Sequence, residues 1–177
     1  PIGAGSLFTG LRKGLSEWIE IGIAEGDMPV FHGAQATGCN PVATAFEEDR
    51  DFIKPVKPDT IAKSLAIGNP ADGPYAVDVA KETGGTIEQV TDDEIRAGIK
   101  LLAHTTGIFT ETAGGVTIAS LKKIADRGEI GTDETVVAYV TGEGLKTLDA
   151  ARGTFEKYEI EPTLDSFNGL VPTPVSA

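Results

Sequence analysis

The sequence alternates between segments with helical periodicity and short segments rich in β-branched and aromatic residues. This alternation is typical of α/β folds, in which each helix returns the chain to the next strand of a parallel sheet. The pattern predicts strands at residues 28–35, 86–90 and 135–140. It predicts helices from residue 6 to about residue 22 or 26, after Thr91, and at residues 41–48, 60–67, 75–82 and 116–125. We therefore expect an α/β layer with parallel strands over residues 1–150, followed by an extended tail at residues 151–177.

The clearest helix start follows the second predicted strand. Thr91 and Glu94 have the spacing of a capping box, in which each side chain accepts a hydrogen bond from the other residue's backbone amide. The core-facing positions of this helix are Ile95, Ile99, Leu102 and Ala103.

Parallel sheets bind ligands beyond the carboxyl ends of their strands. Three glycine-containing stretches lie at or near such ends, at residues 3–5, 111–115 and 141–142. The second is predicted to be a turn before the helix at 116–125. These stretches are where we expect a binding site.

Composition narrows the class of protein. The chain has 177 residues, a formal net charge of -12 and 40% hydrophobic residues, which indicates one globular domain with a substantial core. Such an acidic chain repels nucleic acid and anionic membranes, and no apolar run reaches the ~18 residues of a membrane-spanning helix. A single cysteine, Cys39, excludes a disulfide framework and favours a cytoplasmic protein.

The first glycine stretch leads directly into a helix. In Pro-Ile-Gly-Ala-Gly-Ser, Gly3 and Gly5 allow a tight turn, and Ser6 is a predicted N-cap. Free amides at the positive end of a helix form a seat for phosphate, although a plain strand-to-helix turn explains the same glycines. The stretch matches neither the six-residue dinucleotide fingerprint nor a nucleotide-triphosphate loop.

Four stretches read together indicate a family. They are PIGAGSLF (1–8), AIGNPADG (66–73), TETAGGVT (110–117) and VTGEGLKT (140–147). In this order they resemble the C-terminal part of threonine synthase, a pyridoxal-phosphate enzyme of fold type II. The resemblance runs from Pro1 to about Asp149 and implies a three-layer parallel-sheet domain of the kind found in the tryptophan synthase β subunit.

The resemblance also implies which residues bind pyridoxal 5'-phosphate. The backbone cup for its phosphate corresponds to Gly3, Ala4, Gly5, Ser6 and Leu7, although many threonine synthases carry a Gly-Asn-Ala-Gly-Asn cup instead. Thr141 corresponds to the residue whose hydroxyl meets the pyridine nitrogen, and Glu111 to an acid beside the ring. The alternative for Thr141 is a strand-end hydroxyl that caps the next turn, and for Glu111 a helix-start acid favoured by the dipole. Asn69 and Asp72 lie in a turn that resembles a substrate-side loop of the family, and we interpret them instead as ordinary turn formers.

No residue is assigned to the covalent chemistry. The lysine that holds the cofactor aldehyde lies in the N-terminal third of the family, and Lys54, Lys57, Lys63 and Lys146 match none of its motifs. We expect that lysine upstream of Pro1, so the chain is interpreted as a C-terminal fragment that is inactive without the N-terminal half. The complete enzyme is expected to be a homodimer acting on a small phosphorylated amino acid.

Two other functions are compatible with the sequence. A threonine or serine dehydratase-like lyase shares the glycine turn and TETAGG, but VTGEGLKT argues against it. A non-catalytic phosphate- or metabolite-binding α/β module would keep the scaffold without the lysine. His32 and His104 have no carboxylate partners at ligand spacing, so no metal site is expected, and Cys39 has no adjacent basic residue to activate it.

Overall fold

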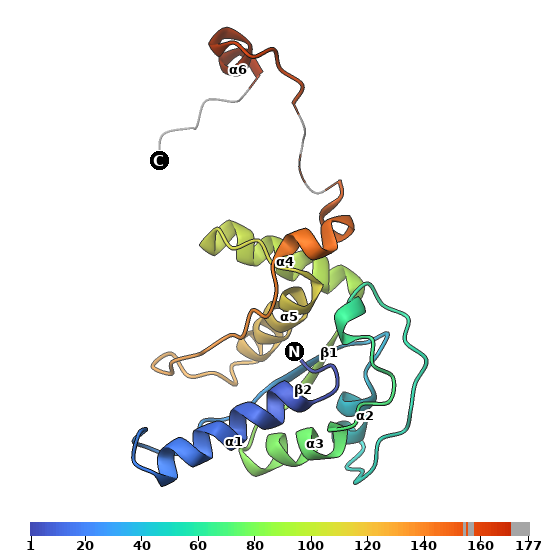
Figure 1. The fold of residues 1–177 in the computed structure, drawn as a ribbon, viewed down its shortest axis with the longest axis vertical. Coiled ribbons are helices and arrows are strands. Elements are labelled where there is room, and N and C mark those ends of the chain that lie inside the picture. The colour runs from blue at the N-terminus through green and yellow to red at the C-terminus, as the bar shows by residue number, and fades with distance from the viewer. Residues whose placement is uncertain (154, 156–157, 171–177) are drawn as a thin grey trace.

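The computed structural model describes residues 1–153, 155 and 158–170 of the chain (Figure 1). Two strands are present, β1 (Gly33–Ala36) and β2 (Ile87–Val90). The α-helices are α1 (Ser6–Glu20), α2 (Pro41–Glu47), α3 (Gly73–Glu82), α4 (Asp92–Thr106), α5 (Thr112–Asp126) and α6 (Leu164–Leu170). Short 3-10 helices occur at η1 (Lys63–Leu65) and at η2 (Gly144–Ala151), which is kinked at Thr147.

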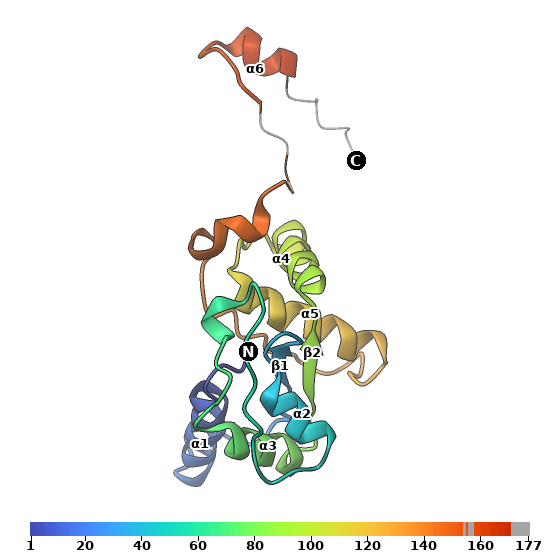
Figure 2. The ribbon, with the colours of Figure 1, turned by 90° about the vertical axis from the view of Figure 1, so that its right-hand side faces the viewer.

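The strands form a parallel pair between two layers of helices. Gly33 lies opposite Ile87 and Ala36 opposite Val90. Helix α5 packs on one face of this pair, and α2 packs on the other face with α1 and α3 beyond it (Figures 1 and 2). Residues before the first helix lie beside β1, because the Ile2 amide donates a 2.8 Å hydrogen bond to the Ala34 carbonyl. The predicted α/β fold with a parallel sheet is therefore confirmed.

Each face of the sheet has its own buried cluster. Ile87 packs with residues of α1, α2 and α3 on one side, including Phe8, Val42 and Val77. Val90 packs with residues of α4 and α5 on the other side. Alternate strand residues point to opposite faces of a sheet. Because helices cover both faces here, neither face of the sheet is left open to solvent.

Helices α4 and α5 pack closely because of two glycines. A Cβ on Gly98 would lie 2.5 Å from the Gly115 carbonyl oxygen, and a Cβ on Gly115 would lie 2.6 Å from the Ile95 carbonyl oxygen. The predicted capping box is confirmed, with the Thr91 hydroxyl accepting from the Glu94 amide and the Glu94 carboxylate accepting from the Thr91 amide. Desolvation alone would raise the pKa of Glu94, but hydrogen bonds from Thr91 and Lys123 lower it.

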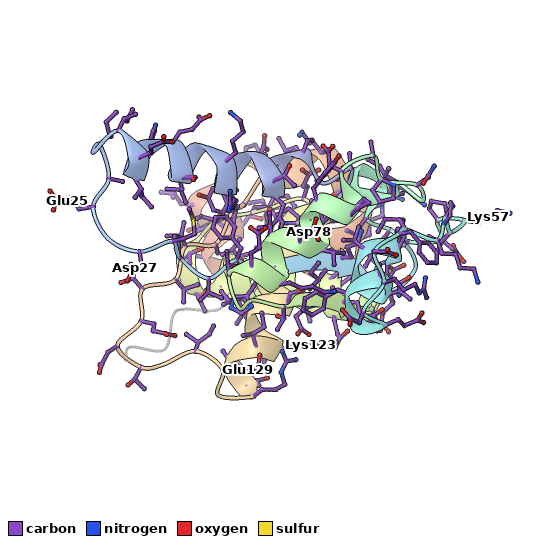
Figure 3. All side chains as sticks on the ribbon, turned by 90° about the horizontal axis from the view of Figure 1, so that it is seen from below. Glu25, Asp27, Lys57, Asp78, Lys123 and Glu129 are labelled. Carbon is purple, nitrogen blue, oxygen red and sulfur yellow. The ribbon has the colours of Figure 1, made fainter. Side chains whose placement is uncertain are left out.

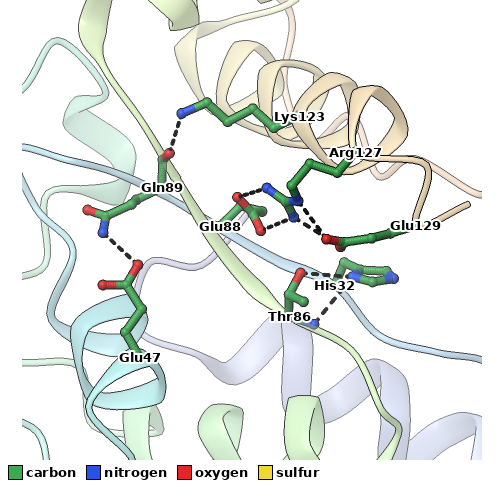
Figure 4. Close-up of polar contacts among 8 residues, drawn as sticks. All are labelled: His32, Glu47, Thr86, Glu88, Gln89, Lys123, Arg127 and Glu129. Atoms are coloured by element: carbon green, nitrogen blue, oxygen red, sulfur yellow. Dashed lines mark hydrogen bonds and ion pairs between the residues drawn. The ribbon is translucent and has the colours of Figure 1, made fainter.

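Polar contacts tie the end of α5 to β2 (Figure 4). The Arg127 guanidinium donates to both carboxylate oxygens of Glu88, at 3.1 and 2.6 Å, and also binds Glu129. Beside it, Nδ1 of His32 accepts from the Thr86 amide at 3.3 Å. Of the charged side chains labelled in Figure 3, Glu25, Asp27, Lys57 and Asp78 are exposed. No helix in the described part of the chain is long and apolar enough to cross a membrane.

Most predicted helices are confirmed, but several predictions were wrong. The predicted helix at 60–67 is reduced to η1, and the strand predicted at 28–35 begins only at Gly33. The predicted turn at 111–115 is the first part of α5, because Gly114 and Gly115 are small for packing rather than for turning. The tail at 151–177, predicted as extended, contains α6.

The largest difference concerns residues 135–140. They were predicted to form a buried strand, but they are assigned to neither strand, and Val137 is 71% exposed. No strand in the described part of the chain pairs with them. A β-rich sequence forms a strand only when a neighbouring strand provides its hydrogen bonds.

Candidate functional site

The glycine turn stands at the carboxyl end of the segment beside β1. Ile2 is buried, with 1% of its surface exposed, and the chain then turns at residues 3–5 into α1. Gly5 has φ 103° and ψ -22°, a conformation that disfavours any residue with a Cβ. It is also the N-cap of α1, so the prediction that Ser6 is the N-cap was wrong by one position.

A second loop holds this turn in place. The Asp72 amide donates a 3.0 Å hydrogen bond to the Ala4 carbonyl. A Cβ on Gly5 would lie 2.8 Å from the Asp72 carbonyl oxygen, so the two loops touch through their backbones. The predicted turn AIGNPADG (66–73) therefore acts on the glycine turn through its main chain.

The amides around this turn have no partner within the described chain. The N–H groups of residues 3–8 donate no hydrogen bond to any described residue, whereas the Thr9 amide donates to the Gly5 carbonyl. The first turn of α1 has no acidic side chain. Unpaired amides at the start of a 15-residue helix whose first turn has no acidic side chain can bind an anion.

The second group of predicted residues gathers at the start of α5. The Gly142 carbonyl accepts two hydrogen bonds, from the Glu111 amide at 3.1 Å and from the Thr110 hydroxyl at 2.9 Å. A Cβ on Gly142 would lie 1.9 Å from Glu111 Oε1, so the glutamate side chain rests directly on this glycine. Thr141 itself is exposed, and Glu111 is buried with 5% of its surface exposed. The structure thus places Glu111 beside the Thr141–Gly142 turn.

Two hydroxyl groups at this end of α5 escaped the sequence analysis. Thr147, at the kink of η2, accepts a 3.1 Å hydrogen bond from the Thr112 amide and so satisfies one free amide of the helix. The Thr112 hydroxyl is buried and has no partner among the described residues. Only the run of threonines around TETAGG and GLKT could have indicated these positions, since hydroxyls favour helix starts.

The glycine turn and the start of α5 both border η1. A Cβ on Gly3 would lie 3.7 Å from a methyl group of Leu65. Leu65 belongs to the same buried cluster as Ala113 and Val116 of α5. One apolar side chain therefore connects the two groups of predicted residues.

The four lysines considered above lie at or near the surface. Lys54, Lys57 and Lys63 are exposed and have no carboxylate partner among the described residues. Lys146 is closest to the candidate site, with its Nζ 3.9 Å from Glu111 Oε1, but its side chain is 64% exposed. None of the four is buried, as a lysine that holds the cofactor aldehyde would be.

Comparison with known proteins agrees with the sequence resemblance. A family described as "Pyridoxal-phosphate dependent enzyme" matches residues 1–142. The threonine synthase of Methanocaldococcus jannaschii is 42% identical over 163 residues, which cover 91% of this chain and 40% of that protein. That of Halalkalibacterium halodurans is 38% identical over 179 residues, which cover 97% and 48%. The chain spans less than half the length of these relatives.

Solved structures share the fold. A fungal L-serine ammonia-lyase from Rhizomucor miehei superposes with a TM-score of 0.67 at 22% identity, over 88% of this chain and 49% of that one. The processed form of threonine deaminase isoform 2 from Solanum lycopersicum gives a TM-score of 0.62 at 21% identity, over 86% and 43%. At these identities the likeness concerns the fold alone.

Proposed function

Because the chain belongs to the family of pyridoxal-phosphate-dependent enzymes, we propose that it is the cofactor-phosphate-binding part of a threonine synthase. That enzyme converts O-phospho-L-homoserine and water into L-threonine and phosphate. Support comes from identities of 38–42% to threonine synthases over more than nine-tenths of this chain. The alignment with solved ammonia-lyases and deaminases is half as identical, so a dehydratase-like activity is the weaker alternative.

The observation that carries the proposal is the row of unpaired amides at the start of α1. A phosphate needs several N–H donors at short range. Residues 3–8 provide the donors, and the first turn of α1 contains no acid. Gly5 brings the turn against Asp72, where a Cβ would not fit. The cofactor phosphate is bound by Gly3, Ala4, Gly5, Ser6 and Leu7.

The ring of the cofactor is assigned to the residues around Glu111 and the Thr141–Gly142 turn. When bound, pyridoxal phosphate supplies an electron-withdrawing ring that stabilises negative charge on the substrate. The Thr141 hydroxyl would donate to the ring nitrogen, and unlike a carboxylate it would not hold a proton on that nitrogen. Glu111 holds the Thr141–Gly142 turn through its amide and lines the ring with its carboxylate.

The covalent chemistry is assigned to a part of the enzyme outside these 177 residues. Lys54, Lys57, Lys63 and Lys146 lack the burial of such a lysine. Residues 135–140 pair with no described strand. Because an unpaired row of backbone groups can pair with a strand of another segment, these residues support the proposal that a structural neighbour is missing. This chain alone is therefore expected to be inactive. The complete enzyme is a cytoplasmic homodimer in this proposal.

Amide-resolved NMR tests the phosphate site. Inorganic phosphate and pyridoxal phosphate should each shift the amide resonances of residues 3–8, and each should compete with the other. Pyridoxal phosphate alone should also shift Thr141 and Gly142. The matched variants Thr141→Ser and Thr141→Val separate the hydroxyl from the side-chain shape: only the valine variant should weaken binding of the ring.

Three results would contradict the proposal. Phosphate that leaves residues 3–8 unchanged would remove the assigned site. Shifts at residues 3–8 with inorganic phosphate but none with pyridoxal phosphate would favour a non-catalytic phosphate-binding module. Borohydride reduction that attaches the cofactor to one of the four named lysines would contradict the inactivity of this chain.

For the complete enzyme, an activity assay separates a synthase from a dehydratase. A synthase forms threonine from O-phospho-L-homoserine, whereas a dehydratase forms a 2-oxo acid from threonine.

A further inference from the structure

The segment of residues 141–147 lies against the start of α5. In its first half, the Gly144 amide donates a hydrogen bond to the Phe109 carbonyl at 3.0 Å, and the Gly142 carbonyl accepts the 3.1 Å hydrogen bond from the Glu111 amide. A Cβ on Gly144 would lie 2.4 Å from the Phe109 ring, so this close approach requires a glycine. The first half of the segment is therefore held directly against Glu111.

The second half of the segment is attached through one side chain. The Thr147 hydroxyl accepts a 3.1 Å hydrogen bond from the amide of Thr112, the first residue of α5. Thr147 has φ -136° and ψ 47°, so η2 is interrupted at the residue whose hydroxyl reaches the helix start. The next part of η2 is fixed to α4, because Arg96 donates to the Ala150 carbonyl at 3.0 Å. The hydroxyl is thus presented to α5 from a supported position.

This contact differs from ordinary helix capping. An N-cap side chain usually accepts a hydrogen bond from an amide in the first turn of its own helix, as Thr91 does in α4. The N-cap residue of α5 is Glu111, and its side chain makes no capping hydrogen bond. A hydroxyl 35 positions along the chain from Thr112 accepts from the first turn instead. The start of α5 therefore does not occupy the Glu111 carboxylate.

This carboxylate has few contacts in the described part of the chain. It accepts no hydrogen bond from a described residue, and its ion-pair contact, with Lys146 Nζ, is at 3.9 Å. Only 5% of the Glu111 surface is exposed. Polar groups buried to this extent usually have hydrogen-bond donors around them. The Glu111 carboxylate is therefore available to a bound molecule.

We propose that Thr147 is a positioning residue for the cofactor ring. By capping α5 in place of Glu111, its hydroxyl keeps the glutamate carboxylate free and holds the segment of residues 141–147 on the helix. This inference rests on the proposed function and extends it to a residue that is assigned no contact with the cofactor.

The physical reason is the cost of an unpaired buried amide. Thr112 is 1% exposed, so without the Thr147 hydroxyl its amide would be buried and unsatisfied. Two movements relieve this cost: the Glu111 carboxylate turns onto the helix start, or the segment of residues 141–147 moves off α5. Either movement takes away a group that is assigned to the ring.

Amide-resolved NMR of the 177-residue chain during titration with pyridoxal phosphate tests this role. Thr147→Val keeps the shape of the side chain but removes the hydroxyl. It should raise the Kd of pyridoxal phosphate, measured at Thr141 and Gly142, about two- to thirtyfold, the range expected for loss of one cap. Thr147→Ser keeps the hydroxyl and should change this Kd by less than about twofold. Thr147→Ala is a second variant without the hydroxyl, in case the valine variant does not fold.

Two controls separate positioning from a general loss of structure. The Kd of inorganic phosphate at residues 3–8 should change by less than about twofold in every Thr147 variant, because Thr147 makes no hydrogen bond to that turn. Thr91→Ala removes a cap of the same kind from α4 and should leave both Kd values unchanged. Hydrogen exchange without ligand checks the cap itself: the Thr112 amide should exchange faster in Thr147→Val than in the native chain or Thr147→Ser.

The pattern across the variants decides the outcome. Weaker binding of pyridoxal phosphate in Thr147→Val, with rescue by Thr147→Ser and unchanged binding of inorganic phosphate, supports the role. Equal Kd values for Thr147→Val and the native chain would overturn it while leaving the proposed function intact. Equal weakening of inorganic phosphate, or a serine variant that behaves like the valine variant, would also overturn it. If pyridoxal phosphate shifted neither Thr141 nor Gly142 in the native chain, the ring assignment would fail and the positioning role with it.

Discussion

Replacing Gly5 with alanine tests the backbone geometry on which the phosphate site depends. At φ 103° a residue with a Cβ is strained, which costs about 1–3 kcal/mol. The new Cβ would also lie 2.8 Å from the Asp72 carbonyl oxygen and 2.9 Å from the Asp72 Cβ, so the loop must move. Overpacking of this kind adds about 1–3 kcal/mol. We expect Gly5→Ala to lower the free energy of unfolding by roughly 2–6 kcal/mol.

Thermal unfolding, monitored by circular dichroism, measures this effect. For a chain of this size, about 1 kcal/mol corresponds to roughly 2–4 °C in Tm, so Gly5→Ala should lower Tm by about 4–24 °C. Gly14→Ala on the same helix is the matched control, because nothing lies within 4 Å of its Cβ position. Alanine is the better helix former there, and Tm should rise slightly. If Gly5→Ala and the native chain had the same Tm, the backbone geometry inferred at Gly5 would be refuted.

Three further changes test other parts of the structure. Thr91→Ala removes the capping hydroxyl of α4 and should lower the free energy of unfolding by about 0.5–2 kcal/mol, as measured by urea titration; no change in the urea midpoint would contradict the cap. Desolvation by burial lowers the pKa of His32 below 6.5, against the attraction of Glu129 and Glu88, so the unfolded chain binds the proton at higher pH. The free energy of unfolding should therefore fall as pH decreases from 6.5 towards the folded pKa, and His32→Gln should remove this part of the pH dependence. Burial raises the pKa of the Cys39 thiol, so iodoacetamide should react slowly with the native chain at pH 8 and rapidly in urea, as followed by mass spectrometry.

Local signals in the sequence were sufficient for most helices. The proline at the start of α2 and the Thr91–Glu94 capping box each depend on residues within a few positions of one another. The glycine turn was also predictable, because its glycines immediately precede a helix. Its dependence on Asp72 was not, since the two loops are about 67 positions apart and meet only in the fold.

Predictions failed where the structure of a segment depends on the elements that pack or pair with it in the fold. Gly114 and Gly115 were interpreted as a turn, yet they lie inside α5, where α4 and Thr110 approach too closely for a Cβ. Residues 135–140 have strand composition but no strand beside them in the described chain. The local sequence indicates neither how closely another helix approaches nor whether a strand is present for pairing.

The sequence by itself determined the order of helices and strands, the position of the glycine turn and, through four motifs, the enzyme family. These features follow from propensities and spacings that act over a few residues. Only the tertiary structure decided that Glu111 rests on Gly142 and that Asp72 restrains Gly5. Each of these contacts joins residues more than 30 positions apart, and such contacts depend on how complete helices and strands pack together.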